Sequence, residues 1–126
     1  MYRLYAAIAV LALVISVTAA CFFVNTRTAD DITNELEQAY ALAKESRTDN
    51  SREHIEKALR IIDERRGLVY LFITHKILDD IAQEVSKALE CISEGDITPF
   101  LVYCRCAVSL TTDLRAMEYP EIANLL

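Results

Sequence analysis

The sequence predicts an all-α protein, in which an N-terminal transmembrane helix is followed by an antiparallel bundle of three to four amphipathic helices. Three observations predict this class. The 126 residues include only two glycines and two prolines, which are too few turn-forming residues for a sheet of many short strands. Hydrophobic residues make up 53% of the chain, which excludes intrinsic disorder. Finally, an uncharged apolar run comes first, and apolar residues recur at helical spacing after it.

The apolar run extends from Leu4 to Val24 and contains no charged residue. A helix of this length spans about 30 Å, which matches the hydrocarbon core of a bilayer. The run also lacks the polar face that a helix of a small soluble domain would need. We therefore expect a transmembrane signal-anchor over residues 1–27 and an acidic helical domain over residues 28–126.

The charges beside the run predict its orientation. Arg3 and the α-amino group precede it, whereas Arg27 is followed closely by Asp30 and Asp31. Because positive charge is enriched on the cytoplasmic side, we expect a cytoplasmic N-terminus. The helical domain would then be extracytoplasmic, on a single-pass protein of the cell membrane.

Two other fates of the apolar run remain open. Residues 17–19 and 18–20 carry the small side chains that signal peptidase requires at its cleavage site. The apolar residues 21–24 continue past both sites, which favours an uncleaved anchor. Residues 19–21 also faintly resemble a lipoprotein signal ending in Cys21, although Thr18 stands where such signals prefer Leu.

The first amphipathic helix is expected over residues 28–44. Thr28 and Asp31 have the spacing of a capping box in which Asp replaces Glu. The same helix could instead simply prolong the membrane helix. Apolar side chains follow at steps of three and four residues: Ile32, Leu36, Ala39, Tyr40 and Ala43.

A second helix should follow the polar residues 45–50, which predict a tight turn and thus an antiparallel neighbour. Asn50 is expected to cap this helix, with Glu53 at its third position. Gly67 then interrupts the pattern. The expected apolar face comprises Ile55, Ala58, Leu59 and Ile62.

Residues 68–73 are apolar enough for a strand, but no second strand is present to pair with them, so we expect helix, continuous or after a kink. A near-heptad seam then runs to residues 93–96, which end the helix. It comprises Leu71, His75, Leu78, Ala82, Val85, Leu89 and Ile92. Pro99 after Thr98 predicts the first turn of a last helix, which Pro120 ends. Its expected apolar face is Leu101, Cys104, Ala107, Val108, Leu114 and Met117.

Residues 71–81 read Leu-Phe-Ile-Thr-His-Lys-Ile-Leu-Asp-Asp-Ile. This segment resembles the Leu-Phe-x-x-His-x-x-Leu-Asp-x-Ile core of domain-of-unknown-function family 4363, a family of small bacterial membrane-anchored proteins. The layout and residues 122–126 at the chain end are similar too. The chain has no Trp, which such proteins often carry near the positions of Ile62 and Leu68. The resemblance implies a Gram-positive, Clostridia-like source, an anchored helical domain and no assigned activity.

His75 is the residue with the most distinctive position, because it interrupts an apolar seam and Asp79 lies one helical turn further on. The simpler interpretation is a buried His, hydrogen-bonded to Asp79 or Thr74, that fixes the helix register. The alternative is a pH-sensing or ligand-binding role. His54 is the other His of the chain, and the two do not form a zinc motif, so no metal site is expected.

The cysteines suggest no metal motif either. Cys104 and Cys106 would point to different sides of a helix, and Cys21 lies in the apolar run. If the domain faces outward, Cys91 could form a disulfide with Cys104 or Cys106 across the turn between two helices. Buried free thiols are the alternative that we favour.

No phosphate-binding loop, nucleophile elbow or pair of catalytic carboxylates stands out, so we expect no enzyme and no cofactor. The net charge of −6 argues against nucleic acid as a partner. We expect an anchored interaction module that binds a larger membrane or envelope protein through leftover apolar surface. The alternatives are a sensor centred on His75, or a homo-oligomer if the seam of residues 71–92 is exposed.

Overall fold

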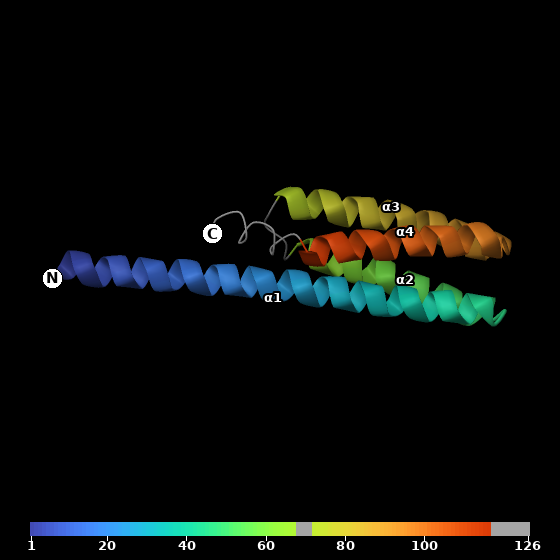
Figure 1. Cartoon of the computed structure of the whole chain (residues 1–126), viewed down its shortest axis with the longest axis horizontal. Helices are drawn as coiled ribbons and strands as arrows, with labels where there is room; N and C mark the ends of the chain where they lie inside the picture. The colour runs from blue at the N-terminus through green and yellow to red at the C-terminus, as the bar shows by residue number, and fades with distance from the viewer. Residues whose placement is uncertain (68–71, 117–126) are drawn as a thin grey trace.

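Four helices make up the structure, and the first extends far beyond the other three (Figure 1). The structure is a computed structural model that describes residues 1–67 and 72–116. The helices are α1 (Tyr2–Lys44), α2 (Thr48–Arg66), α3 (Phe72–Glu94) and α4 (Ile97–Ala116), and the described residues contain no strand. The predicted all-α class is confirmed, with four helices in the bundle.

α1 is one unbroken helix of 43 residues. Residues 2–24, here called the apolar segment, project from the bundle, whereas residues 25–44, the bundle half of α1, pack against the other helices (Figure 1). The predicted capping box is wrong, because Thr28 lies inside the helix and its hydroxyl donates to the Val24 carbonyl at 2.7 Å. The amphipathic helix thus prolongs the apolar one, across the expected boundary at residues 27 and 28.

The apolar segment makes almost no contact with the rest of the chain. Residues 1–20 are all exposed, and the first buried residue of α1 is Asn25. Within the described residues, α1 is the one helix long and apolar enough to cross a membrane, with a mean hydropathy of 2.7 over its most apolar stretch, none of it buried. By length and composition the segment therefore suits a membrane anchor or a signal sequence.

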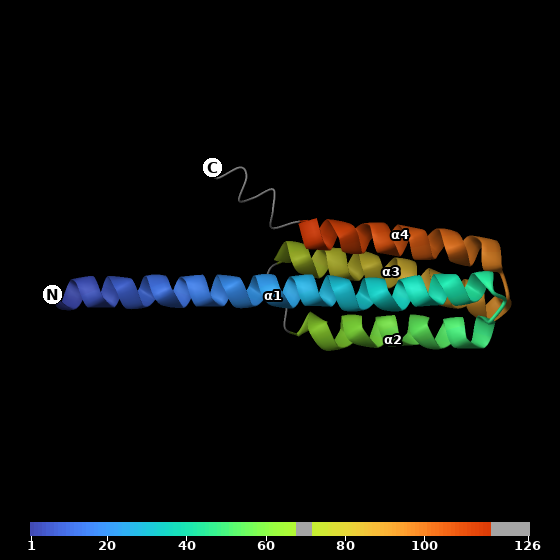
Figure 2. The same ribbon diagram turned by 60° about the horizontal axis from the view of Figure 1, so that its bottom comes forward.

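The helices run alternately up and down and pack as a ring, in which α4 returns to lie against α1. Figure 2 shows α2 and α4 on opposite sides of α1. We call the end from which the apolar segment leaves the base. The opposite end, where the turns from α1 to α2 and from α3 to α4 lie, is the tip (Figures 1 and 2).

Each helix buries one stripe of residues at alternating steps of three and four, which is the spacing of a coiled-coil seam, and α1 also buries Thr28 beside its stripe. α1 buries Asn25, Ala29, Ile32, Leu36, Ala39 and Ala43 in this register, and α2 buries Ser51, Ile55, Ala58 and Ile62. α3 buries Leu78, Ile81, Val85, Ala88 and Ile92, and α4 buries Phe100, Cys104, Ala107, Thr111 and Leu114. The core is therefore a set of four interlocking stripes.

The expected seam of α3 is partly wrong. Ala82 and Leu89, which were expected in it, are half-buried, and Ile81 and Ala88 take the fully buried positions. The helix carries two adjacent apolar stripes, and packing between α2 and α4 selects one of them. In α4, the expected Leu101 and Val108 are likewise half-buried. The expectations for residues 68–71 and for Met117 and Pro120 lie outside the described residues.

The two turns at the tip share one geometry, the Schellman motif. After α1, Ser46 has a φ of 64° and the Arg47 N–H donates to the Leu42 carbonyl at 2.9 Å. After α3, Gly95 has a φ of 81° and the Asp96 N–H donates to the Cys91 carbonyl at 2.9 Å. Because the turn after α1 is short, α2 already begins at Thr48.

The predicted cap at Asn50 is accordingly wrong. The N-cap position of α2 is Arg47, whose side chain makes no capping hydrogen bond, and Asn50 lies exposed in the first turn. α4 begins at Ile97, so that Pro99 falls within its first turn as predicted, where its missing N–H leaves no acceptor unpaired.

Candidate functional site

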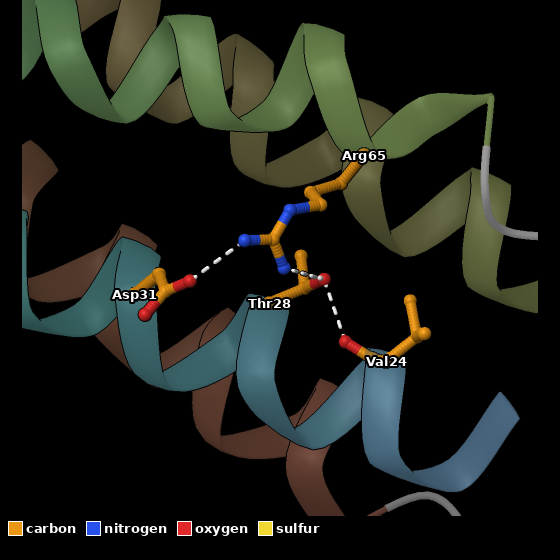
Figure 3. A network of polar contacts seen from close by, with 4 residues as sticks. All are labelled: Val24, Thr28, Asp31 and Arg65. Carbon is orange, nitrogen blue, oxygen red and sulfur yellow. Dashed lines mark hydrogen bonds and ion pairs between the residues drawn. The ribbon is translucent and has the colours of Figure 1, made fainter. Parts of the chain in front are cut away.

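A partly buried polar network joins α1 and α2 near the base. Arg65 donates to the Asp31 carboxylate at 2.9 Å and to the Thr28 hydroxyl at 3.2 Å (Figure 3). Because Thr28 gives its own proton to the Val24 carbonyl, its oxygen is free to accept from the guanidinium. The network thereby fixes the rotation of α2 relative to α1 at the point where the apolar segment meets the bundle.

Two further Arg–Asp pairs lie near the base. Arg66 of α2 pairs with Asp79 of α3 at 2.8 Å, and Arg115 of α4 pairs with Asp30 of α1. Together with the Arg65 pair, they link three of the four neighbouring helix pairs in the described bundle. All three arginines stand in the last turn of their helices, where a cation is favoured by the helix dipole.

This arrangement changes the interpretation of His75. The residue is half-buried on α3, not fully buried. Among the described contacts, Asp79 pairs with Arg66 and not with His75, because it points across to α2. The expected pairing of His75 with Asp79 is therefore replaced by an ion pair between two helices, and the alternative partner Thr74 has a side chain outside the described part of the structure. A sensing role for His75 would have to operate without Asp79 as the group that orients its imidazole.

The chain instead pairs its other histidine, which the sequence did not single out. His54 Nδ1 of α2 lies 2.6 Å from Glu35 Oε2 of α1, and the side chains are only 19% and 20% exposed. Nothing in the local sequence of either residue signals this contact. Only the register of the α1–α2 hairpin, in which both residues lie at similar distances from the turn, could have indicated it.

The cysteines are free thiols in the structure. Cys104 is buried and Cys106 is exposed, so the two point to different sides of α4 as predicted. Burial raises the pKa of Cys104 to about 12, which keeps that thiol protonated and a poor nucleophile at neutral pH. Burial, aided by Asp96, Glu94 and Glu90, also raises the pKa of Cys91. Within the described residues, no group of three metal-ligating side chains comes together.

The outer face of α4 differs from those of the other helices. We call five of its exposed residues, which follow one another at alternating steps of four and three, the α4 stripe: Thr98, Val102, Arg105, Ser109 and Thr112. Only one of the five is charged. The corresponding stripe of α2 is charged at every position: Asp49, Glu53, Glu56, Arg60 and Asp63. Val102 is 55% exposed, and among the described residues it is the one large exposed hydrophobic side chain outside residues 1–23.

A shallow groove of about 250 Å³ runs beside this stripe, between α1 and α4. Its lining is Glu37, Tyr40, Cys104, Arg105 and Val108. Arg105 donates to the Tyr40 hydroxyl at 3.4 Å, which lowers the pKa of Tyr40. The Tyr40 ring also has two cations beside it, Arg105 at 5.0 Å and Lys44 at 4.9 Å from its centroid.

The geometry defines a class of protein: an antiparallel four-helix bundle carried on a long first helix whose apolar half is exposed. The chain belongs to the family described as a domain of unknown function, DUF4363, whose family model matches residues 22–125. The match covers the whole described bundle and the end of the apolar segment. No curated protein and no solved structure matches the chain.

Proposed function

We propose that the protein is a membrane-anchored accessory module that docks onto a larger membrane or envelope protein through the outer face of α4. The observation that carries this proposal is the continuity of α1, which joins an exposed apolar segment to a folded bundle with no linker between them. A bundle held in this way presents its long faces to proteins that stand beside it in the same membrane.

The apolar segment supports anchoring because it is apolar on all sides and its stretch of highest hydropathy is entirely exposed. In a soluble protein such a surface would need a partner to cover it, whereas a bilayer covers it directly. Tyr2 and Tyr5 near one end, and Phe22 and Phe23 near the other, suit the two membrane interfaces. Arg3 lies at the N-terminal end of the apolar segment, opposite the bundle. By the positive-inside rule, we therefore expect the N-terminus in the cytoplasm and the bundle outside it.

The α4 stripe supports docking because of its composition. Protein interfaces are depleted in charge at their centre and enriched in Tyr and Arg as energetic anchors. Val102 and Ser109 provide an uncharged surface, and the neighbouring groove adds Tyr40 and Arg105. The outer face of α2, with a charge at every position, would instead have to desolvate five ions.

Photo-crosslinking in cells tests the docking face. A photoreactive amino acid in place of Val102 or Ser109 should trap one discrete partner, whereas the same probe in place of Glu53 or Glu56 on α2 should not. The matched α2 positions are also exposed and control for random capture. Equal product patterns from both helices, or no discrete product from α4, would contradict docking through α4.

The intact mass of the protein in membrane and soluble fractions tests the anchor. We expect the uncleaved chain in the membrane fraction. A soluble product that begins at residue 20 or 21 would show that the apolar segment is a cleaved signal, and a lipid on Cys21 would show a lipoprotein.

A further inference from the structure

The charge of the bundle is distributed unevenly between its two ends. We divide the described bundle at the middle of each helix, so that the base half comprises residues 25–34, 57–66, 72–83 and 107–116, and the tip half residues 35–56 and 84–106. The base half has seven basic and seven acidic residues and is neutral, whereas the tip half has five basic and ten acidic residues. The acidic excess of the described bundle therefore lies entirely toward the tip.

Every helix also presents one exposed cation near the base. These are Arg27 of α1, Arg66 of α2, Lys76 of α3 and Arg115 of α4. Arg27 and Lys76 make no ion pair among the described residues. Arg66 and Arg115 each pair with one Asp, and their side chains stay 44% and 54% exposed. Because a guanidinium has five N–H donors, each of these arginines can bind a further anion.

The apolar segment determines what faces these cations. α1 continues without a break from Val24 into Asn25, so a bilayer around the apolar segment ends within about one helical turn of Arg27. The surface at that depth is the layer of lipid phosphates. We propose that the base of the bundle binds the phosphate groups of anionic phospholipids in that leaflet through these four cations, so that the bundle stands upright on the membrane.

The acidic tip fits this placement. The bundle half of α1 has 20 residues and is therefore about 30 Å long, which places the tip several Debye lengths from the lipid phosphates at physiological salt. The anionic surface then attracts the cations of the base, while its repulsion of the acidic tip is screened. A bundle lying flat on any of its long faces would bring part of the acidic tip against the lipids. This inference rests on the anchoring proposed above, but not on the docking face.

The test uses the full chain in nanodiscs of phosphatidylcholine alone or with phosphatidylglycerol. A lipid that binds only the folded base should raise the melting temperature of the bundle, measured by circular dichroism, by about 5 °C in the anionic discs. The variant Arg27→Gln with Lys76→Gln removes two cations that have no ion pair among the described residues, and should lose at least half of this rise. Arg47→Gln with Arg52→Gln makes the same charge change at the tip and should keep it. A rise that is absent, or equally reduced in both variants, overturns the proposal.

The chain contains no Trp, so the fluorescence of one introduced Trp reports the orientation of the bundle without a signal from other Trp residues. Thr112→Trp lies near the base and Thr98→Trp near the tip, on the same exposed stripe of α4. A nitroxide on the lipid headgroup should quench the first strongly and the second little, and equal quenching overturns the upright posture. A chain that does not enter the discs overturns both this proposal and the anchor, whereas failure of crosslinking at α4 leaves this one intact.

Discussion

At the residue scale, buried hydroxyl groups give the seams of α1, α2 and α4 a small polar component. Ser51 donates to the Ala39 carbonyl across the α1–α2 interface at 2.7 Å. Thr111 gives its proton to the Val108 carbonyl, so Thr33 is the donor in the 2.6 Å contact between these two threonines. Among the described residues, no buried side-chain polar atom lacks a hydrogen bond. These hydrogen bonds offset the desolvation cost of the polar residues at heptad positions.

The two tip turns predict opposite changes in stability for substitutions at their equivalent residues, Ser46 and Gly95. Gly95→Ala should lower the free energy of unfolding by about 1 kcal/mol, because Ala is strained at positive φ. Ser46→Gly should raise it by up to about 1 kcal/mol, because it relieves the same strain after α1. Urea unfolding of the bundle measures both changes, and changes of the same sign would contradict the shared motif.

Cys104 should make stability fall with pH in the alkaline range. Its thiol ionises near pH 8.5 in the unfolded chain but only near 12 in the folded one, so its contribution to stability is fully present below about pH 8. As the pH rises from about 9 to 12, the unfolded state loses the proton first, and up to about 1.4 kcal/mol is lost per pH unit. The measurement compares pH profiles of unfolding for the native chain and Cys104→Val, which should lack this component. Parallel pH profiles for the two proteins would show that folding does not suppress ionisation of the Cys104 thiol.

Polar contacts between helices set rotation and register at the element scale. Along the α1–α2 interface, Ser51 contacts α1 nearest the tip, His54 pairs with Glu35 one turn further on, and Arg65 reaches Asp31 near the base. These contacts are spread along the hairpin, so sliding α2 by one turn would break all of them together. Small core residues such as Ala39 and Ala58 let the two helices approach closely but do not by themselves define a register.

Replacement of Arg65 should therefore destabilise the bundle more than replacement of an outer arginine. Arg65→Met leaves the Asp31 carboxylate without its partner and should cost about 1–2 kcal/mol, reduced from the buried value because Asp31 is 38% exposed. Arg60→Met on the exposed face of the same helix is the control and should change stability by less than about 0.5 kcal/mol. Thermal or urea unfolding provides the comparison, and equal losses would show that the network has no stabilising role.

At the scale of the whole molecule, the four seams close on one another. The part of the 71–92 seam that the structure describes is buried, with Leu78, Val85 and Ile92 each at most 4% exposed. The apolar surface that a homo-oligomer would use is thus inside the bundle. What stays outside includes the apolar segment at one end and the α4 stripe along one side, so the proposed anchor and the proposed docking face would be separate in space.

A chain of residues 25–126 should accordingly be a folded monomer in solution. Every heptad position of the described core is buried within one chain, so the seams need no second copy to cover their apolar side chains. Sedimentation equilibrium with circular dichroism measures mass and helix content together. A stable dimer of this chain would instead support the homo-oligomer hypothesis, and the α4 stripe would then be the first surface to test by Val102→Glu.

The sequence by itself determined the helical class, the order of the elements, a turn within residues 45–50, the helix end at residues 93–96 and the apolar segment. Each of these depends on local composition or periodicity, which act within a few residues. Only the tertiary structure decided that Ile81 and not Ala82 is fully buried, that Asp79 pairs with Arg66, and that Glu35 meets His54. These partners depend on the rotation and axial shift of neighbouring helices, and packing of all four seams at once determines both.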